Sequence, residues 1–185
     1  MRTLPASLCT LEPQIADHAA EMFRVLSDPA IYEFENEPPE SEAWLRRRFE
    51  LLESRAPDDG SEDWLNWVVR LPGGALAGYV QATVSRDGWA YVAYELSSRY
   101  WRQGIGSCAV RAMLGELADR YGVQTFIAVL NARNFRSRAL LQRLHFELAA
   151  EELLLQHRDE EDEIVMVRVQ TQPGGEPGGH SSGSC

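Results

Sequence analysis

The sequence predicts a mixed α/β (α+β) domain, with a mixed sheet and helices on both of its faces, and three observations lead to this prediction. Helical and strand-like patterns follow one another in the order α α β β β α β α β β along the 185 residues. Glycine-containing turns at 72–74 and 86–88 join consecutive β-rich runs as hairpins. The run Val123–Leu130 is largely apolar, which is typical of a strand buried on both faces.

Two amphipathic helices and three strands are expected in the first half of the chain. The first helix is expected at Pro13–Leu26, because Pro13 suits a first helical turn and apolar residues then share one face. Ser41 can cap the second helix, whose apolar stripe runs from Trp44 to Leu52. The three β-rich runs are Trp64–Leu71, Ala75–Ser85 and Trp89–Ser97.

A third helix should begin near Gly104 and stop at Gly122, because apolar residues recur every four positions between them. Beyond the buried strand, Asn134–Leu144 has the pattern of a fourth helix. Two late strands are expected on either side of an acidic turn, at Phe146–Gln156 and Glu163–Gln170. These elements form one predicted domain over residues 1–170, and the Gly-, Pro- and Ser-rich residues 171–185 are expected to be a disordered tail.

The composition argues against several classes of protein. The chain carries 18 basic and 28 acidic residues, and a net charge of −10 argues against binding to nucleic acid or to an anionic membrane surface. No apolar run approaches the ~20 residues of a membrane helix, and the N-terminal residues lack the pattern of a signal peptide. The three cysteines are widely spaced, without metal-ligand spacing. We therefore expect a cytoplasmic protein without a metal site.

A glycine turn between a strand and a helix is the most informative motif. Gly104 and Gly106 open the third helix, whose first backbone N–H groups lack partners and carry partial positive charge. Glycines let the oxygens of an anion approach that backbone. The surrounding segment Arg99–Arg143 holds eight Arg against Glu116 and Asp119, a net +6. The motif therefore indicates a site for a polyanionic small ligand; the alternative is a tight turn beside solvated helix faces.

A second polar stretch follows the buried strand. Asn131, Asn134 and Ser137 lie where that strand passes into the fourth helix. Asparagine at such a position usually caps the helix. Beside a cofactor the same side chains can instead bind an amide or a hydroxyl group.

Together these stretches resemble the GNAT N-acetyltransferases, in particular the RimJ/RimL-like branch. Tyr94-Glu95-Leu96 followed by Tyr100-Trp101-Arg102-Gln103-Gly104-Ile105-Gly106 is similar to the acyl-CoA motif of that branch. Asn131, Asn134 and Ser137 are similar to its Asn-x-x-Ser motif. The sequence departs from the family pattern in three places. His145 stands where the family has Gly, which implies a left-handed His, and Leu141 replaces a frequent general-acid Tyr. Ser107-Cys108 replaces a frequent Thr-Glu pair.

The resemblance implies a mostly antiparallel sheet of about seven strands that splays in the middle, between the strands that end at Ser97 and Leu130. It implies that acetyl-CoA lies in the splay as co-substrate, with its pantetheine arm against the first strand and its pyrophosphate on the glycine turn. The residues it implies for coenzyme binding are Leu96, Ser97, Ser98, Arg102, Gln103, Gly104, Ile105, Gly106, Ser107 and Asn134.

The implied reaction is the transfer of an acetyl group to a primary amine by direct attack. An amine with a pKa of ~10.4 is almost fully protonated at neutral pH, so a general base is useful. Glu95 is the candidate base, through water, and Ser137 the candidate donor to the departing thiolate. For each residue a structural role remains open: a solvent-facing strand carboxylate for Glu95 and a helix cap for Ser137.

The charge pattern suggests the second substrate. Acidic residues gather at Glu33–Glu42 and at Asp159–Glu163, two segments that border the acceptor end of the cleft in the family's fold. We therefore expect a cationic acceptor, either a small amine or a protein N-terminus, and a monomer or homodimer. Two alternatives remain: a non-catalytic acyl-CoA-binding module, and an interaction protein on the same scaffold.

Overall fold

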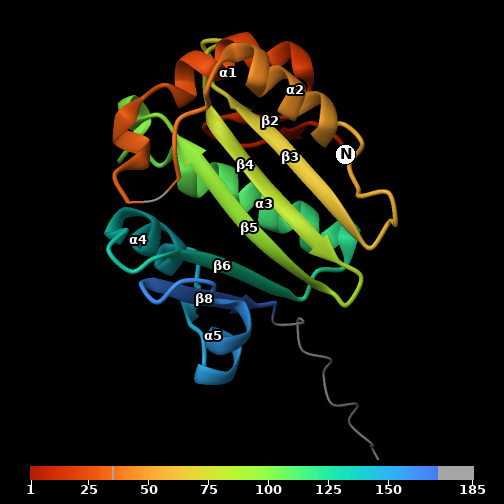
Figure 1. Cartoon of the computed structure of the whole chain (residues 1–185), viewed down its shortest axis with the longest axis vertical. Coiled ribbons are helices and arrows are strands. Elements are labelled where there is room, and N and C mark those ends of the chain that lie inside the picture. The colour runs from red at the N-terminus through yellow and green to blue at the C-terminus, as the bar shows by residue number, and fades with distance from the viewer. Residues whose placement is uncertain (35, 171–185) are drawn as a thin grey trace, which may run out of the picture.

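The computed structural model describes residues 1–34 and 36–170, and one sheet organises them. Its eight strands lie in the order β1-β2-β3-β4-β5-β6-β8-β7 (Figure 1). The strands are β1 (Leu4–Pro5), β2 (Thr10–Pro13), β3 (Glu62–Arg70), β4 (Leu76–Ser85), β5 (Trp89–Leu96), β6 (Thr125–Asn131), β7 (Glu147–Leu148) and β8 (Glu163–Val169). The predicted tail, 171–185, lies outside the described residues.

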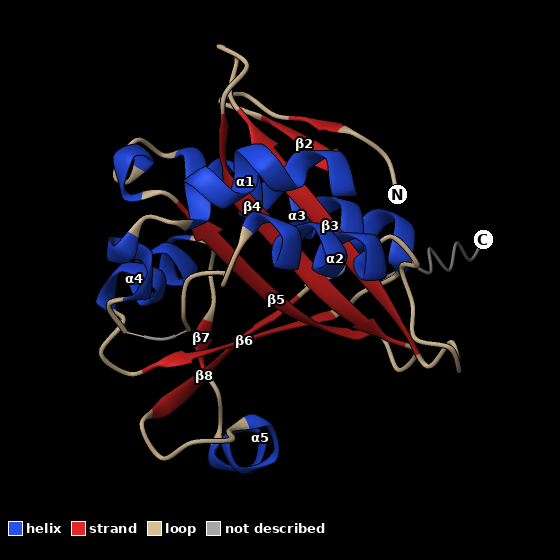
Figure 2. Ribbon diagram, turned by 45° about the horizontal axis from the view of Figure 1, so that its top comes forward, coloured by secondary structure: helices blue, strands red, loops and turns tan. Residues whose placement is uncertain are grey.

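Helices cover both faces of the sheet, as the sequence predicts (Figure 2). The α-helices are α1 (Ala19–Leu26), α2 (Glu42–Leu52), α3 (Ile105–Tyr121), α4 (Phe135–Arg143) and α5 (Glu151–His157). Three short 3-10 helices are η1 (Ala16–His18), η2 (Pro29–Tyr32) and η3 (Ser98–Tyr100). Within the described part of the chain, none of these helices is long and apolar enough to cross a membrane.

Two apolar clusters hold the layers together. Helices α3 and α4 bury Met113, Leu117 and Leu141 against one face of the sheet. Helices α1 and α2 bury Met22 and Phe49 against the other face. Membership of a cluster shows on which face of the sheet a strand side chain lies. On the α1/α2 face, polar side chains interrupt the apolar surface.

The central strands separate where the sheet was expected to splay. Strands β5 and β6 are parallel and pair at three positions, from Trp89–Thr125 to Tyr91–Ile127. β5 continues to Leu96 and β6 to Asn131, and in the described chain these continuations do not pair with each other. Figure 2 shows the two strands diverging toward α4. All the other strand pairs are antiparallel, so the splayed, mostly antiparallel sheet is confirmed.

Two element predictions are wrong. Pro13 does not open a helix: it ends β2 and pairs with Trp67, so helical structure starts only at Ala16. This additional pairing, with β1 beside it, gives eight strands where about seven were expected. The strand expected at Phe146–Gln156 is limited to Glu147–Leu148, and the rest forms α5. Glu, Leu and Gln favour helix, and Glu151 and Glu152 stabilise its N-terminus.

Candidate active site

A cavity of about 1020 Å³ opens where β5 and β6 diverge. It is lined by the α1–α2 loop, α2, the central strands, the N-terminus of α3 and α4. Eight of the predicted site residues line it, and they are Glu95, Leu96, Arg102, Gly104, Gly106, Ser107, Asn134 and Ser137. The topology thus brings the two motif stretches to one cavity, although they lie on different strands and helices.

The N-terminus of α3 forms a backbone cradle at one end of this cavity. Gly104 is the N-cap residue, in a left-handed conformation with φ +78°. The N–H of Cys108 makes the first helical bond, to the Gly104 carbonyl at 2.9 Å. The N–H groups of residues 105–107 therefore have no acceptor within the helix and can bind an anion. This geometry fits a pyrophosphate group.

The second glycine of the motif has a different structural role. A Cβ on Gly106 would lie 2.9 Å from Leu140 Cδ1 of α4, so this glycine lets the two helices approach each other. A Cβ on Gly104 would lie 3.3 Å from Leu8 Cδ1, and its φ disfavours any side chain. Of the two glycines, Gly104 is the one that the left-handed turn into the cradle requires.

Four predicted residues keep their side chains out of the cavity. The Gln103 amide donates to the Arg99 carbonyl at 2.9 Å, at an exposed position. Ile105 is buried in the core beneath α3. Ser97 and Ser98 turn toward Asp28 instead. Gln103 and Ile105 can therefore offer a ligand only their backbone, whereas the N–H groups of Ser97 and Ser98 are already bonded to the Ala77 carbonyl and to Asp28.

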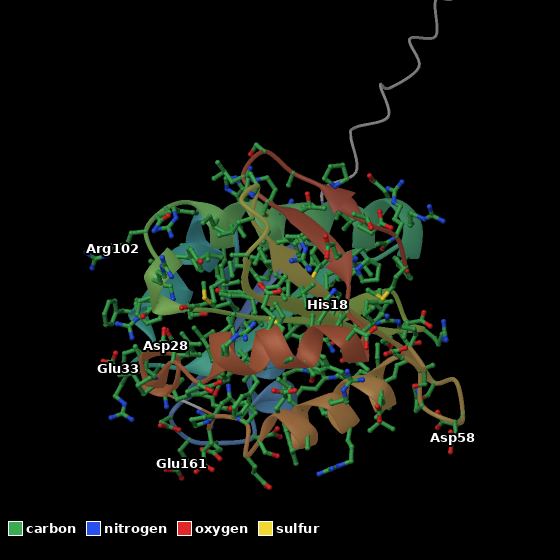
Figure 3. All side chains as sticks on the ribbon, turned by 90° about the horizontal axis from the view of Figure 1, so that it is seen from above. His18, Asp28, Glu33, Asp58, Arg102 and Glu161 are labelled. Carbon is green, nitrogen blue, oxygen red and sulfur yellow. The ribbon has the colours of Figure 1, made fainter. Side chains whose placement is uncertain are left out.

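Asp28 fixes the loop that joins β5 to α3. Its carboxylate accepts hydrogen bonds from the Ser98 N–H at 2.7 Å, the Ser97 hydroxyl at 3.2 Å and the Ala30 N–H at 3.1 Å. Burial raises the pKa of Asp28, but these hydrogen bonds outweigh it and leave the pKa below its ordinary value. Figure 3 shows Asp28 at the same end of the molecule as Glu33 and Arg102. No role in the site was predicted for Asp28 from the sequence, so this role was missed.

Arg136 is bound by neighbouring side chains. Its guanidinium lies 4.4 Å from the centre of the Trp101 ring and 5.0 Å from that of Phe34, and it forms an ion pair with Glu33. The Trp101 indole N–H donates to the Leu96 carbonyl at 2.8 Å. Arg136 therefore joins the α1–α2 loop to α4, and much of its charge is met by Glu33.

Glu95 projects from the α1/α2 face of β5 into the cavity. Its carboxylate accepts a hydrogen bond from the Asn36 side-chain amide at 3.2 Å. Its partner in the register of β4 is Tyr79. Burial raises the pKa of the Tyr79 phenol well above its ordinary value, and the adjacent Glu95 carboxylate raises it further. Tyr79 therefore stays neutral beside the carboxylate.

Asn134 and Ser137 both lie at the start of α4 but differ in role. The Asn134 side-chain oxygen Oδ1 accepts the Ser137 N–H at 3.0 Å, so Asn134 is the helix cap. The Ser137 hydroxyl lies 2.8 Å from the Tyr94 hydroxyl, which links α4 to β5 across the splay. Tyr94 was named from the sequence as part of the acyl-CoA motif but was given no polar role. Its position on the motif strand was the available signal for a polar role.

The remaining motif positions are structural. Asn131 donates to the Asp162 carboxylate at 2.6 Å and accepts the Arg133 N–H at 3.0 Å, so it holds the acidic turn. His145 has φ +64°, the left-handed conformation expected where the family has glycine. Within residues 1–34 and 36–170, no group of three or more His, Cys, Asp or Glu side chains is placed to hold a metal ion.

Comparison with solved structures shows the same fold at low sequence identity. The RimL ribosomal L7/L12 alpha-N-protein acetyltransferase in complex with coenzyme A is 20% identical, with a TM-score of 0.75 over 90% of this chain and 97% of that one. The Salmonella typhimurium acetyltransferase that modifies the N-terminal serine of L7/L12 is 17% identical, with a TM-score of 0.74 over 91% and 99%. The Vibrio fischeri ribosomal-protein-S5-alanine acetyltransferase is 17% identical, with a TM-score of 0.72 over 90% and 96%.

Sequence comparison settles the family. None of the curated proteins searched matches the chain. A family model described as an acetyltransferase (GNAT) domain matches residues 9–147, about three quarters of the chain. This span includes β2 to β7 and therefore both sides of the splay. The chain thus belongs to the GNAT family and is an N-acetyltransferase that uses acetyl-CoA.

Proposed function

We propose that the enzyme acetylates a primary amine, carried by a small cationic molecule or a protein N-terminus, by direct attack on bound acetyl-CoA. The observation that carries the proposal is one continuous cavity, which joins the backbone cradle of α3 to the Glu95 carboxylate across the splay. Donor and acceptor can therefore be bound together, and no covalent acetyl-enzyme is needed. The three structural neighbours named above are acetyltransferases of ribosomal proteins, which supports a protein N-terminus as the acceptor.

The residues around the splay fit acetyl-CoA. The N–H groups from Arg102 to Ser107 would hold the pyrophosphate, and the edge of β5 from Leu96 to Ser98 would face the pantetheine arm. The Ser98 N–H is already bonded to Asp28 and would not contact the ligand, so other polar groups of this loop would do so. Asn134 lines the same part of the cavity. The coenzyme supplies an activated thioester carbonyl, and the protein supplies its orientation.

Glu95 is the proposed general base. A lysine-like amine is neutral in only about one molecule in a thousand at pH 7, and a positioned base typically contributes 10²–10⁴-fold. Glu95 is partly buried in the cavity and oriented by Asn36. Glu163 also lines the cavity, but its Oε2 accepts the N–H groups of Asp159 and Glu160 at 2.9 and 3.0 Å. Those bonds hold Glu163 in the acidic turn.

Ser137 is the proposed proton donor to the departing thiolate. Its hydroxyl lines the cavity and lies 2.8 Å from the Tyr94 hydroxyl. Tyr94 can replace the proton that Ser137 gives up, because the two oxygens are within hydrogen-bond distance. Leu141 cannot take part, since its side chain is apolar and buried.

The proposed cationic acceptor rests on fewer charges than the sequence suggested. Glu37, Glu40, Glu95 and Glu163 line the cavity. Glu33 is paired with Arg136 instead, and from the segment Asp159–Glu163 only Glu163 lines the cavity. Arg48 lies on the same side and opposes part of this field. The balance of charge near the acceptor remains acidic and favours a cation.

A thiol-release assay with acetyl-CoA and a panel of amines tests the proposal. We expect turnover with at least one cationic amine or peptide N-terminus, and Glu95→Gln should lower kcat by about 10²–10⁴-fold with little change in acetyl-CoA affinity. Glu147→Gln is the control, because Glu147 is an exposed strand glutamate outside the cavity. Binding of acetyl-CoA without turnover across the panel would contradict the proposal and favour a non-catalytic acyl-CoA-binding module.

A further inference from the structure

Three amide side chains form a row on the floor of the cavity, beneath α2. Asn66 of β3 and Gln81 of β4 are partners in the sheet register, and both line the cavity. Gln14, which follows β2, continues the row: its N–H donates to the Asn66 carbonyl at 2.9 Å, and its side chain also lines the cavity. We call Gln14, Asn66 and Gln81 the amide row.

The amide row lies next to the proposed catalytic carboxylate. The neighbouring row is Val68 of β3, Tyr79 of β4 and Glu95 of β5, which lie two residues along their strands from Asn66, Gln81 and Ala93. Two residues of a strand span about 6.8 Å, and alternate residues share a face. The amide row and Glu95 therefore share the α1/α2 face of the sheet, at adjacent positions on the cavity wall.

The burial of these amides is unusual for a purely structural role. Gln14 and Asn66 are 3% and 4% exposed, next to the apolar cluster under α1 and α2. Gln14 Nε2 has no hydrogen-bond partner among the described residues, and the same is true of Arg55 Nη1. Arg55 lies beside Gln14, because its Nη2 donates to the Gln14 backbone carbonyl at 2.6 Å. A buried donor without a partner destabilises the protein, so its presence at a cavity wall points to a ligand.

We propose that the amide row binds a peptide group of the acceptor, so that the amine substrate is peptide-like and not an alkyl polyamine. This inference rests on the proposed function. A side-chain amide offers two donors and one acceptor, which matches the N–H and C=O of a peptide group. An alkyl chain would leave the row unpaired. A free carboxylate is disfavoured by Glu37, Glu40 and Glu95 on the same cavity.

The spacing supports this orientation of a peptide. An extended chain advances about 3.3–3.6 Å per residue. An N-terminal amine beside Glu95 therefore places the second peptide group about 7 Å away, within reach of Gln81 on the neighbouring strand β4. Asn66 and Gln14 lie one and two strands further, at about 4.8 Å per strand, so they would contact the peptide groups that follow.

Steady-state kinetics with two acceptors, trialanine amide and 1,5-diaminopentane, test this inference. We expect Gln81→Met and Asn66→Leu each to raise the KM for trialanine amide about tenfold, the factor that corresponds to about 1.4 kcal/mol of lost hydrogen bonding. The KM values for acetyl-CoA and for the diamine should stay within about twofold, because neither ligand needs the row. Thr83→Val is the control, since Thr83 shares the face of Gln81 but does not line the cavity.

The outcomes separate this inference from the proposed function. If the wild-type enzyme acetylates no amine, the proposed function fails. If it acetylates both acceptors and the variants change neither KM, or change both equally, the amide row does not recognise peptide groups. A measurement without variants does not depend on how the variants fold: N-acetyl-trialanine amide should compete with the peptide substrate more strongly than N-pentylacetamide, which has neither a free amine nor a second peptide group. Equal inhibition would also overturn the inference. Acetylation of a folded protein that carries an N-terminal trialanine segment, compared with that of the free peptide, shows which of the two is the acceptor.

Discussion

Gly78 should be the glycine whose substitution damages this enzyme most. It lies on β4 opposite Leu96, the last residue of β5, in the part of β5 that does not pair with β6. A Cβ at this position would lie 2.0 Å from the Glu95 carbonyl oxygen and 2.7 Å from Leu96 Cα, whereas ordinary contact begins at 3.4 Å. Both atoms belong to the backbone, so no side chain can turn away. Gly78→Ala must therefore push β4 and β5 apart beside Glu95.

The expected cost is large. Overpacking usually destabilises by about 1–3 kcal/mol, and moving the strands also weakens ladder hydrogen bonds worth about 0.5–1.5 kcal/mol each. The bond from the Ser97 N–H to the Ala77 carbonyl, 2.9 Å long, is the next one along the same edge. We expect a loss of at least about 3 kcal/mol. For a chain of this size that corresponds to a fall in Tm of about 6–12 °C.

Thermal and urea denaturation of Gly78→Ala and Gly115→Ala measure this effect. Gly115 is an exposed residue inside α3, and a Cβ there meets nothing within 4 Å. Gly115→Ala should therefore raise stability by up to about 1 kcal/mol, because alanine favours helix. At a temperature where Gly78→Ala is still folded, its acetyl-CoA affinity should also fall, since the Glu95–Ser98 backbone has moved. A Gly78→Ala protein as stable as the wild type would refute the close approach of the two strands.

Two further predictions concern the coenzyme end of the cavity. Gly104→Val should weaken acetyl-CoA binding at least tenfold in a binding titration, because lost hydrogen bonds to a charged group amount to about 1.5–3 kcal/mol. Gly122→Val is the control, because Gly122 has a similar φ of +67° at the other end of α3. This control should lose stability but keep its affinity for acetyl-CoA. Equal acetyl-CoA affinities of the two variants would contradict the binding of the coenzyme at the backbone cradle. The lowered pKa of Asp28 implies a contribution to stability that is present above its unfolded pKa of about 3.9 and is lost as the pH falls through the folded value. Urea denaturation between pH 6 and pH 3 should therefore show a smaller acid-induced loss in Asp28→Asn than in the wild type, and equal losses would remove Asp28 from this role.

The sequence predicted the parts of the fold that depend on local pattern. The glycine turn at Gly104, the apolar period of α3 and the continuous apolar run of β6 are local features, and the structure confirms each. The pairing of β2 was missed because it depends on distant β3, and Pro13 fits either the start of a helix or the end of an edge strand. The helix α5 was missed because consecutive leucines fit a buried strand as well as a helix.

The site was predictable to the extent that its residues follow one another in the chain. Gly104 and Asn134 were found through their motifs, but their partners lie elsewhere: Leu140 packs on the glycine turn, Asp28 bonds to Ser98, and Tyr94 bonds to Ser137. The amide row illustrates the same limit. Its members are separated by more than fifty residues between Gln14 and Asn66, and only the sheet register shows that they are neighbours.

Charge around the cavity shows why a count along the chain is a weak guide to the field that a ligand meets. The segment Arg99–Arg143 carries a net +6, yet Arg136 is paired with Glu33 from a distant loop and Arg120 with Glu116 on its own helix. Among the arginines of this segment, Arg102, Arg136 and Arg143 line the cavity. We therefore expect the attraction of the coenzyme phosphates to depend largely on the backbone amides of α3. Directed N–H groups are fixed by the helix and do not move with salt or with side-chain rotamers, so we expect them to set the position of the pyrophosphate and the arginines mainly to raise the local concentration of an anion.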